Sequence, residues 1–114
     1  MDINYRFYEQ HGFGVFEFLH DKLINDDSSE TIEAIKTLIT KKQVQNFILD
    51  LTKVTVIDSV GIGYLIAIKN VAGKKGIIIY LVCKNEFVLR VFNITRVDTF
   101  FRIFRNLDEA LAST

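Results

Sequence analysis

The chain has 114 residues, the length of one domain, so we expect residues 1–114 to fold as a single unit. Apolar residues make up 49% of the sequence and charged residues 25%, which excludes a disordered or membrane-embedded chain. The formal net charge is zero, so no overall field attracts nucleic acid or an anionic membrane, and any partner must recognise a local surface.

The first segments in chain order predict a β-hairpin followed by a helix. Polar and apolar residues alternate over residues 3–8, and a second strand-like run covers residues 15–19 after a glycine-containing break. Asp27 and Glu30 have the spacing of a capping box, and apolar residues then recur at helical intervals to about residue 41.

The middle of the chain predicts a β-α-β unit. Residues 47–51 are mostly apolar, as in a strand covered on both faces. A connector at 52–58 leads to a helix over residues 59–72, which ends at a turn rich in glycine and lysine. The apolar run at 77–82 is then a second buried strand, parallel to the first because a helix separates them.

The last part of the chain predicts two short helices and one strand. Asn85 can cap the first helix, whose apolar side would hold Phe87, Val88, Val91 and Phe92. A strand at 101–104 and a helix beginning near Asn106 follow. The order β-β-α-β-α-β-α-β-α predicts an α/β domain with a mixed β-sheet and helices packed against it.

The segment most informative about function is VIDSVGIG, residues 56–63, where a connector meets the first turn of a helix. Ser59 can cap the free N–H groups of that turn, and its hydroxyl would lie at an exposed corner beside Gly61 and Gly63, whose missing side chains let a protein surface come close. A phosphate there would add about 1.5 to 2 negative charges next to Asp58. The pattern alone favours a purely structural cap and close helix packing over a switch.

The helix after Ser59 has a predicted core face and a predicted partner face. At 100° per residue, Gly61, Leu65, Ile68 and Ala72 cluster on one side and should pack on the sheet. Ile62 and Ile66 point elsewhere and form either an exposed apolar strip for a partner or a flank covered by a neighbouring element.

Other chemistries find little support in the sequence. The third glycine of a dinucleotide fingerprint is replaced by Ile66, and the glycine that a nucleophile elbow needs two residues before its serine is replaced by Ile57. The two histidines lack metal-site spacing, and the single cysteine, Cys83, excludes an internal disulfide and a multi-thiolate zinc site. We therefore expect no cofactor, no metal and no enzymatic activity; a hydrolase using Ser59 would lack a convincing base.

The compartment can also be predicted. The N-terminus lacks the basic start and apolar centre of a signal peptide, and the apolar stretches are far shorter than the roughly 20 residues of a membrane-spanning helix. We expect a cytoplasmic protein without membrane insertion.

The sequence resembles the STAS domains of the bacterial anti-sigma factor antagonist group. The resemblance lies in the strand FILDL at residues 47–51 and in VTVIDSVGIGYL at residues 54–65. In that family an apolar strand ending in an acid or amide plus leucine precedes aspartate-serine-any-glycine-leucine-glycine. Here Ile62 replaces the usual leucine, and Val60 replaces a frequent second serine. The family order continues through the later turn, strand and C-terminal region, so the likeness covers essentially the whole chain.

The resemblance implies a phosphorylation switch on Ser59. Unphosphorylated members bind an anti-sigma factor with serine kinase activity and free the sigma factor; phosphorylation ends this binding, and a serine phosphatase restores it. The partner-binding residues implied are the corner at the start of the second helix, Ile66 on that helix, and Asp26 in an earlier loop; the corner consists of Asp58, Ser59, Val60, Gly61, Ile62 and Gly63. The alternative is a non-switching STAS scaffold or accessory subunit of a stress-signalling or lipid-transport complex.

Overall fold

The computed structural model describes residues 5–24, 29–41 and 44–113. A five-stranded sheet has the order β1-β2-β4-β6-β7, and a two-stranded sheet pairs β3 with β5. The strands are β1 (Tyr5–Gln10), β2 (Phe13–Phe18), β3 (Lys22–Leu23), β4 (Asn46–Asp50), β5 (Val56–Ile57), β6 (Ile78–Val82) and β7 (Arg102–Phe104). The helices are α1 (Ser29–Lys41), α2 (Ser59–Gly73), α3 (Glu86–Ile94), α4 (Leu107–Leu111) and the 3-10 turn η1 (Val97–Thr99).

The opening hairpin is closed by a two-residue turn. His11 and Gly12 both have positive φ, 52° and 83°, which is the requirement of a type I′ turn, and Gln10 pairs with Phe13 across it. The break between the strands is therefore narrower than the sequence indicates, because Phe13 and Gly14 already belong to β2. β1 is the antiparallel edge of a sheet whose other strand pairs are parallel.

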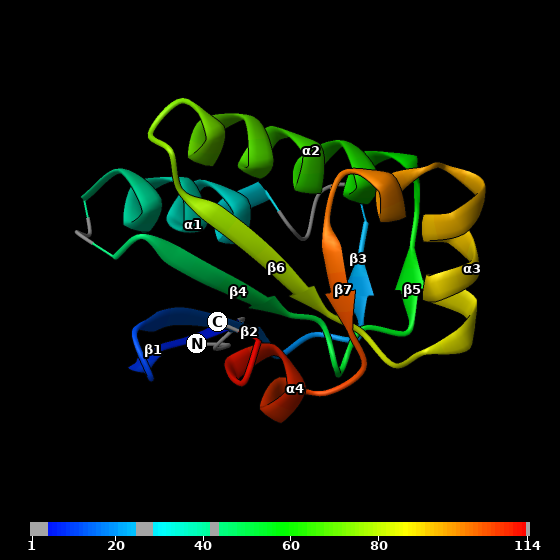
Figure 1. Cartoon of the computed structure of the whole chain (residues 1–114). Coiled ribbons are helices and arrows are strands. Elements are labelled where there is room, and N and C mark those ends of the chain that lie inside the picture. The colour runs from blue at the N-terminus through cyan, green and yellow to red at the C-terminus, as the bar shows by residue number, and fades with distance from the viewer. Residues whose placement is uncertain (1–4, 25–28, 42–43, 114) are drawn as a thin grey trace.

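The central strand β4 divides the core into two parts. Phe47 and Leu49 point into a large cluster shared with α1, α2 and α3, whereas Ile48 belongs to a smaller cluster shared with α4. This alternation follows from the pleat, which sends successive side chains to opposite faces. Figure 1 shows α1 and α2 on one side of the sheet and α4 on the other. The prediction of a strand buried on both faces is confirmed.

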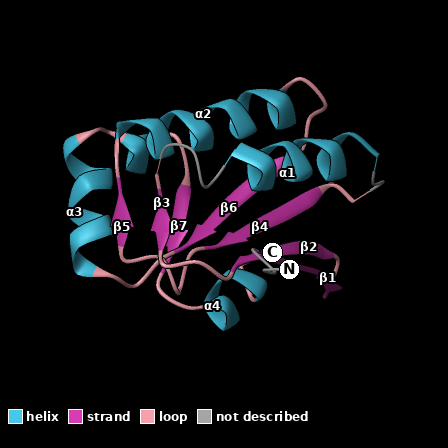
Figure 2. Ribbon diagram, turned by 180° about the vertical axis from the view of Figure 1, so that it is seen from behind, coloured by secondary structure: helices cyan, strands magenta, loops and turns pink. Residues whose placement is uncertain are grey.

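The two short strands β3 and β5 form a separate parallel pair, in which Leu23 is opposite Ile57. Figure 2 shows them beside α3, at the end of the molecule away from the β1–β2 hairpin. Both fall in regions that the sequence indicates only as connectors, since two residues are too few for periodicity to reveal a strand.

The predicted order of the longer elements, the mixed sheet and the parallel orientation of β4 and β6 are confirmed. The apolar side of α3 differs from the prediction: Val88 and Phe92 are buried, but Phe87 is exposed. The helix α3 has nine residues and packs at the end of the sheet, where the rest of the domain covers only part of its apolar face. Asp27, the expected cap of α1, lies outside the described residues.

Leu65, fully buried on the sheet-facing side of α2, tests the packing of this helix. We expect Leu65→Ala to lower the free energy of unfolding by about 2 to 5 kcal/mol, because it removes buried methyl groups and leaves a cavity. Urea denaturation followed by circular dichroism measures the loss. The matched control is Ile78→Ala, on a half-exposed side chain, for which about 1 kcal/mol or less is expected. Equal losses for the two variants would contradict this packing.

Candidate functional site

At the start of α2, one residue caps the helix and the next residue is exposed to solvent. Asp58 is the N-cap residue, with extended backbone, and its Oδ1 accepts a hydrogen bond of 2.9 Å from the backbone N–H of Gly61. Ser59 is the first residue of the helix and is exposed. The expectation that Ser59 caps the helix is therefore wrong, because the carboxylate one residue earlier takes that position. The Ser59 side chain is not required to satisfy the helix end.

The loop that leads to Ser59 is fixed from both sides. Leu51 and Val54 are fully buried, and the backbone N–H of Leu51 donates 2.8 Å to the carbonyl oxygen of Val82 on β6. Further along, the N–H groups of Thr55 and Val56 both donate to the carbonyl oxygen of Asp21, at 2.7 and 3.1 Å. Because its backbone is bonded to two different parts of the fold, this loop presents Ser59 in a defined position.

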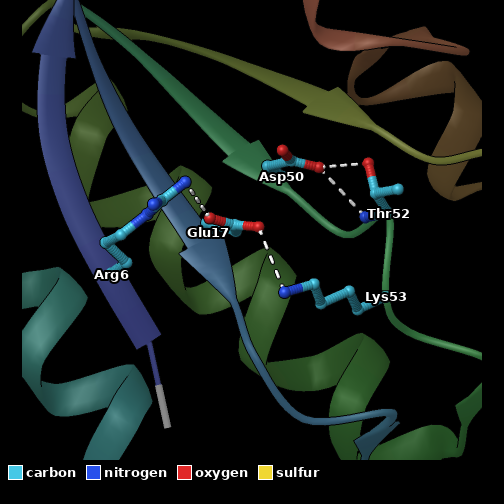
Figure 3. A network of polar contacts seen from close by, with 5 residues as sticks. All are labelled: Arg6, Glu17, Asp50, Thr52 and Lys53. Atoms are coloured by element: carbon cyan, nitrogen blue, oxygen red, sulfur yellow. Dashed lines mark hydrogen bonds and ion pairs between the residues drawn. The ribbon is translucent and has the colours of Figure 1, made fainter. Parts of the chain in front are cut away.

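Asp50 stabilises the beginning of the same loop. Its Oδ1 accepts from the backbone N–H of Thr52 at 3.0 Å and from the Thr52 hydroxyl at 2.5 Å (Figure 3). Asp50 is buried, so these bonds satisfy a carboxylate oxygen that would otherwise be costly to remove from water. The sequence did contain a signal for this turn, an aspartate at a strand end followed two residues later by threonine.

A second carboxylate, Glu17 on β2, lies opposite Asp50 in the strand register. Its two oxygens face different cations: Arg6 Nη2 is 2.7 Å from Oε1, and Lys53 Nζ is 3.6 Å from Oε2 (Figure 3). Burial, followed by the charges of Asp50 and Glu17, raises the pKa of Tyr8 above its ordinary value. The ion pair to Lys53 ties the loop after β4 to the hairpin, which sequence spacing does not reveal.

The two glycines after Ser59 have different surroundings. A Cβ on Gly61 would lie 2.1 Å from the carbonyl oxygen of Leu23 and 2.9 Å from a side-chain carbon of Ile57. A Cβ on Gly63 would meet nothing within 4 Å. Gly61 is therefore needed for packing inside the domain, not for the approach of a partner. Only Gly63 leaves open surface one helical turn after Ser59.

The core face of α2 is as predicted, but the expected partner face is not an exposed apolar strip, since Ile66 is half-buried and packs against the large core cluster. Gly61, Leu65, Ile68 and Ala72 are all buried, which confirms the core face. Ile62 is only 8% exposed and belongs to the large core cluster, so its interpretation as part of an exposed strip is wrong. Its position on the flank of the helix is covered by the neighbouring elements of that cluster.

The outward face of α2 combines Ser59, Gly63 and Ile66, which are spaced i, i+4 and i+7. Ser59 and Gly63 are exposed, and Ile66 is half-buried. Val60, beside Ser59, is also half-buried. We call Ser59, Val60, Gly63 and Ile66 the Ser59 corner. Asp26, the remaining predicted contact residue, lies outside the described residues.

The remaining candidate chemistry is limited. Within residues 5–24, 29–41 and 44–113, no cluster of three or more His, Cys, Asp and Glu side chains could hold a metal ion. Cys83 is a buried free cysteine, and burial raises the pKa of its thiol, which disfavours the reactive thiolate. The helices of the described part of the chain are too short or too polar to cross a membrane.

The domain thus has a capped helix start with an exposed serine, next to a mixed β-sheet. The family profile of the STAS domain matches residues 7–110. The chain belongs to the STAS domain family. The resemblance noted in the sequence is thereby confirmed at the level of the family.

Known STAS-like structures share the fold at low sequence identity. An anti-sigma factor antagonist from Mycobacterium paratuberculosis is 22% identical, with a TM-score of 0.82, and the match covers 96% of this chain and 91% of that one. The phosphorylated form of the Bacillus cell fate determinant SpoIIAA is 16% identical, with a TM-score of 0.70 and coverage of 94% and 96%. A sulfate transporter family protein from Wolinella succinogenes is 22% identical, with a TM-score of 0.74 and coverage of 89% and 83%.

The two glycines of the STAS motif provide a matched pair of substitutions. We expect Gly61→Ala to destabilise the domain by about 1 to 3 kcal/mol or more, because the new methyl group would overlap a backbone carbonyl that cannot rotate away. Gly63→Ala should stabilise by about 0.5 to 1 kcal/mol, since alanine is the better helix former and space is open. Thermal or urea unfolding of the two variants checks the opposite signs.

The cap of α2 can be tested separately from the serine. We expect Asp58→Ala to cost about 0.5 to 2 kcal/mol of stability through loss of the bond to the Gly61 N–H. Asp58→Asn should keep most of it, because an amide oxygen also accepts this bond. Ser59→Ala should cost less than about 0.5 kcal/mol. Denaturation curves of the three variants measure this, and a Ser59→Ala loss as large as that of Asp58→Ala would contradict the assignment of the cap.

Proposed function

We propose that this STAS domain is an anti-sigma factor antagonist whose binding is switched off by phosphorylation of Ser59. The proposal is based on the position of Ser59. This serine is exposed, is the first residue of α2 and lies on the face opposite the core, and it is not needed as a cap because Asp58 caps the helix. A kinase can reach such a hydroxyl without unfolding the helix, and its modification leaves the fold intact. The protein is then the substrate of a kinase and of a serine phosphatase, not itself an enzyme.

The switch follows from electrostatics at the contact surface. A phosphate on Ser59 would lie at the N-terminus of α2, where free N–H groups and the helix dipole favour negative charge, so the domain has no reason to refold. For a partner seated on the Ser59 corner the situation is different. The only charged residue of α2 is Lys69, three turns away, so the added charge would be buried beside Asp58 without a nearby cation on the helix.

Two of the similar structures support this role by their descriptions, one as an anti-sigma factor antagonist and the other as a cell fate determinant in its phosphorylated form. The similarity to a sulfate transporter family protein favours the alternative, a STAS module that serves a larger assembly without a switch. The two functions differ in a measurable way: only the first requires that phosphorylation at Ser59 control binding.

The test is incubation with purified anti-sigma factors of the serine kinase type and ATP, followed by mass spectrometry. We expect a single phosphate on Ser59, and none on Thr55, whose hydroxyl is 3.4 Å from the carbonyl oxygen of Asp21 in the loop. Ser59→Ala should bind the kinase and escape modification. Ser59→Asp should fold normally and bind about 5 to 150 times more weakly, the usual range of coupling between linked sites.

Calorimetric affinities and a nuclear magnetic resonance comparison of the phosphorylated and unmodified forms complete the test. Chemical shift changes confined to the start of α2 are expected. A phosphate mapped to another residue, an unchanged affinity after phosphorylation, or shifts spread across the sheet would each contradict the local mechanism. Retained partner binding with no phosphorylation would favour the non-switching alternative.

A further inference from the structure

Most of the strongly exposed large apolar side chains belong to or adjoin elements at one end of the domain, α3, η1 and β5, which Figures 1 and 2 show near one another. Phe87 and Ile94 on α3 are 53% and 71% exposed, Phe100 after η1 is 51% exposed, and Val56 on β5 is 40% exposed. We call these four residues the α3 patch. Within the described residues the only other side chain of this kind is Ile78, 50% exposed at the start of β6.

The patch arises because the apolar surface of α3 is wider than the part that the domain covers. Val88 and Phe92, four residues apart, are buried against the core. Phe87 and Ile94 are seven residues apart and therefore lie within about 20° of each other on the helix, well away from the buried pair. Val91 lies between the two stripes and is half-buried. An uncovered stripe of this kind is typical of a contact surface.

β5 links the α3 patch to the start of α2 along the chain. β5 contributes Val56 to the patch, packs against α3, and leads through Ile57 directly to Asp58. Figures 1 and 2 both place α3 next to β5, at the end of the molecule where α2 begins.

The chain segment that contains most of the patch has an excess of cations, although one of them, Arg102, lies over the rings of Tyr80 and Phe104 on the sheet. Between Lys84 and Arg105 there are five Lys and Arg residues and two Asp and Glu residues, a formal excess of three positive charges in a chain that is neutral overall. Both acids already have partners in this segment: Glu86 Oε1 is 2.9 Å from Arg105 Nη1, and Asp98 accepts 3.1 Å from Asn93. An acidic partner surface would therefore be complementary to this one.

We propose that the α3 patch is a second docking surface for the anti-sigma kinase, which presents an apolar area with an acidic rim to it. This inference rests on the proposed function. The Ser59 corner consists of small and half-buried residues and cannot by itself supply the roughly 800 Å² per partner of a stable protein complex. The α3 patch adds two phenylalanines, the type of residue that is enriched in interfaces. Docking there would hold the kinase while its active site reaches Ser59.

The experiment uses Phe87→Ser and Ile94→Ser, with Ile78→Ser as a control of similar exposure outside the patch. We expect each patch variant to weaken the calorimetric affinity for the anti-sigma kinase by about 10-fold or more, as for an interface anchor. The KM of Ser59 phosphorylation should rise while kcat is kept, because the acceptor serine and its helix are unchanged. The control should bind and react like the wild type, and urea denaturation verifies that all three variants are folded.

The charge of the partner is tested with Arg90→Glu, an exposed residue of α3, against Lys75→Glu, an exposed residue after α2. We expect Arg90→Glu to slow association with the kinase at low salt, with the difference shrinking at high salt, whereas Lys75→Glu should change the rate little.

The outcomes separate this inference from the proposed function. If the wild type is bound and phosphorylated on Ser59 but both patch variants match the Ile78→Ser control, only the docking surface is overturned. If no anti-sigma kinase binds the wild type, the proposed function fails and the docking surface with it. If Phe87→Ser and Ile94→Ser convert a dimer to a monomer in sedimentation without weakening kinase binding, the patch is a contact between copies and the inference is overturned.

Discussion

Helix α2 approaches strand β3 so closely at Gly61 that a single methyl group would overlap the carbonyl oxygen of Leu23. The position of that carbonyl is set by the pairing of Leu23 with Ile57 on β5, and β5 in turn leads into α2. The helix, the short parallel pair and the loop between them are therefore mutually dependent. Once α2 is seated in this way, the direction of every other side chain on it is fixed by the helical repeat, and Ser59 points away from the core.

In this arrangement, neighbouring residues of the VIDSVGIG motif have different roles. Asp58 satisfies the helix start, Gly61 permits the close contact, and Gly63 leaves the surface open. Ser59 takes no part in any of the three. A side chain that is to be modified reversibly has to be dispensable for folding, because otherwise each cycle of modification would destabilise the domain. The separation of the cap from the serine meets this requirement.

The loop before α2 is held by polar contacts from both neighbouring strands. Asp50 at the end of β4 bonds the loop at Thr52, and Glu17 at the end of β2 attracts Lys53. Buried or half-buried carboxylates are costly unless paired, so their presence here is explained by the loop that they position. On the far side of Ser59, α3 leaves the apolar side chains of Phe87 and Ile94 exposed. This surface and the loop are the basis of the interaction that we propose for the region of Ser59.

The amino-acid sequence by itself determined the order of the longer elements, the burial of β4 on both faces, the core face of α2, and the prominence of Ser59 among the hydroxyl residues. These features depend on local periodicity and on a motif of contiguous residues, both of which are visible in a linear chain. The resemblance to STAS domains rested on the same contiguous residues.

Only the tertiary structure decided which residue caps α2, that Gly61 lies against the carbonyl group of Leu23, that Ile62 is buried and that Phe87 is exposed. Each of these depends on contacts between segments far apart in the chain: Gly61 with Leu23, the flank of α2 with the rest of the core, and α3 with the end of the sheet. Helical periodicity gives the direction of a side chain but not what lies in that direction. The exposed stripe on α3 has the same origin, since a sequence shows how wide an apolar face is but not how much of it the fold covers.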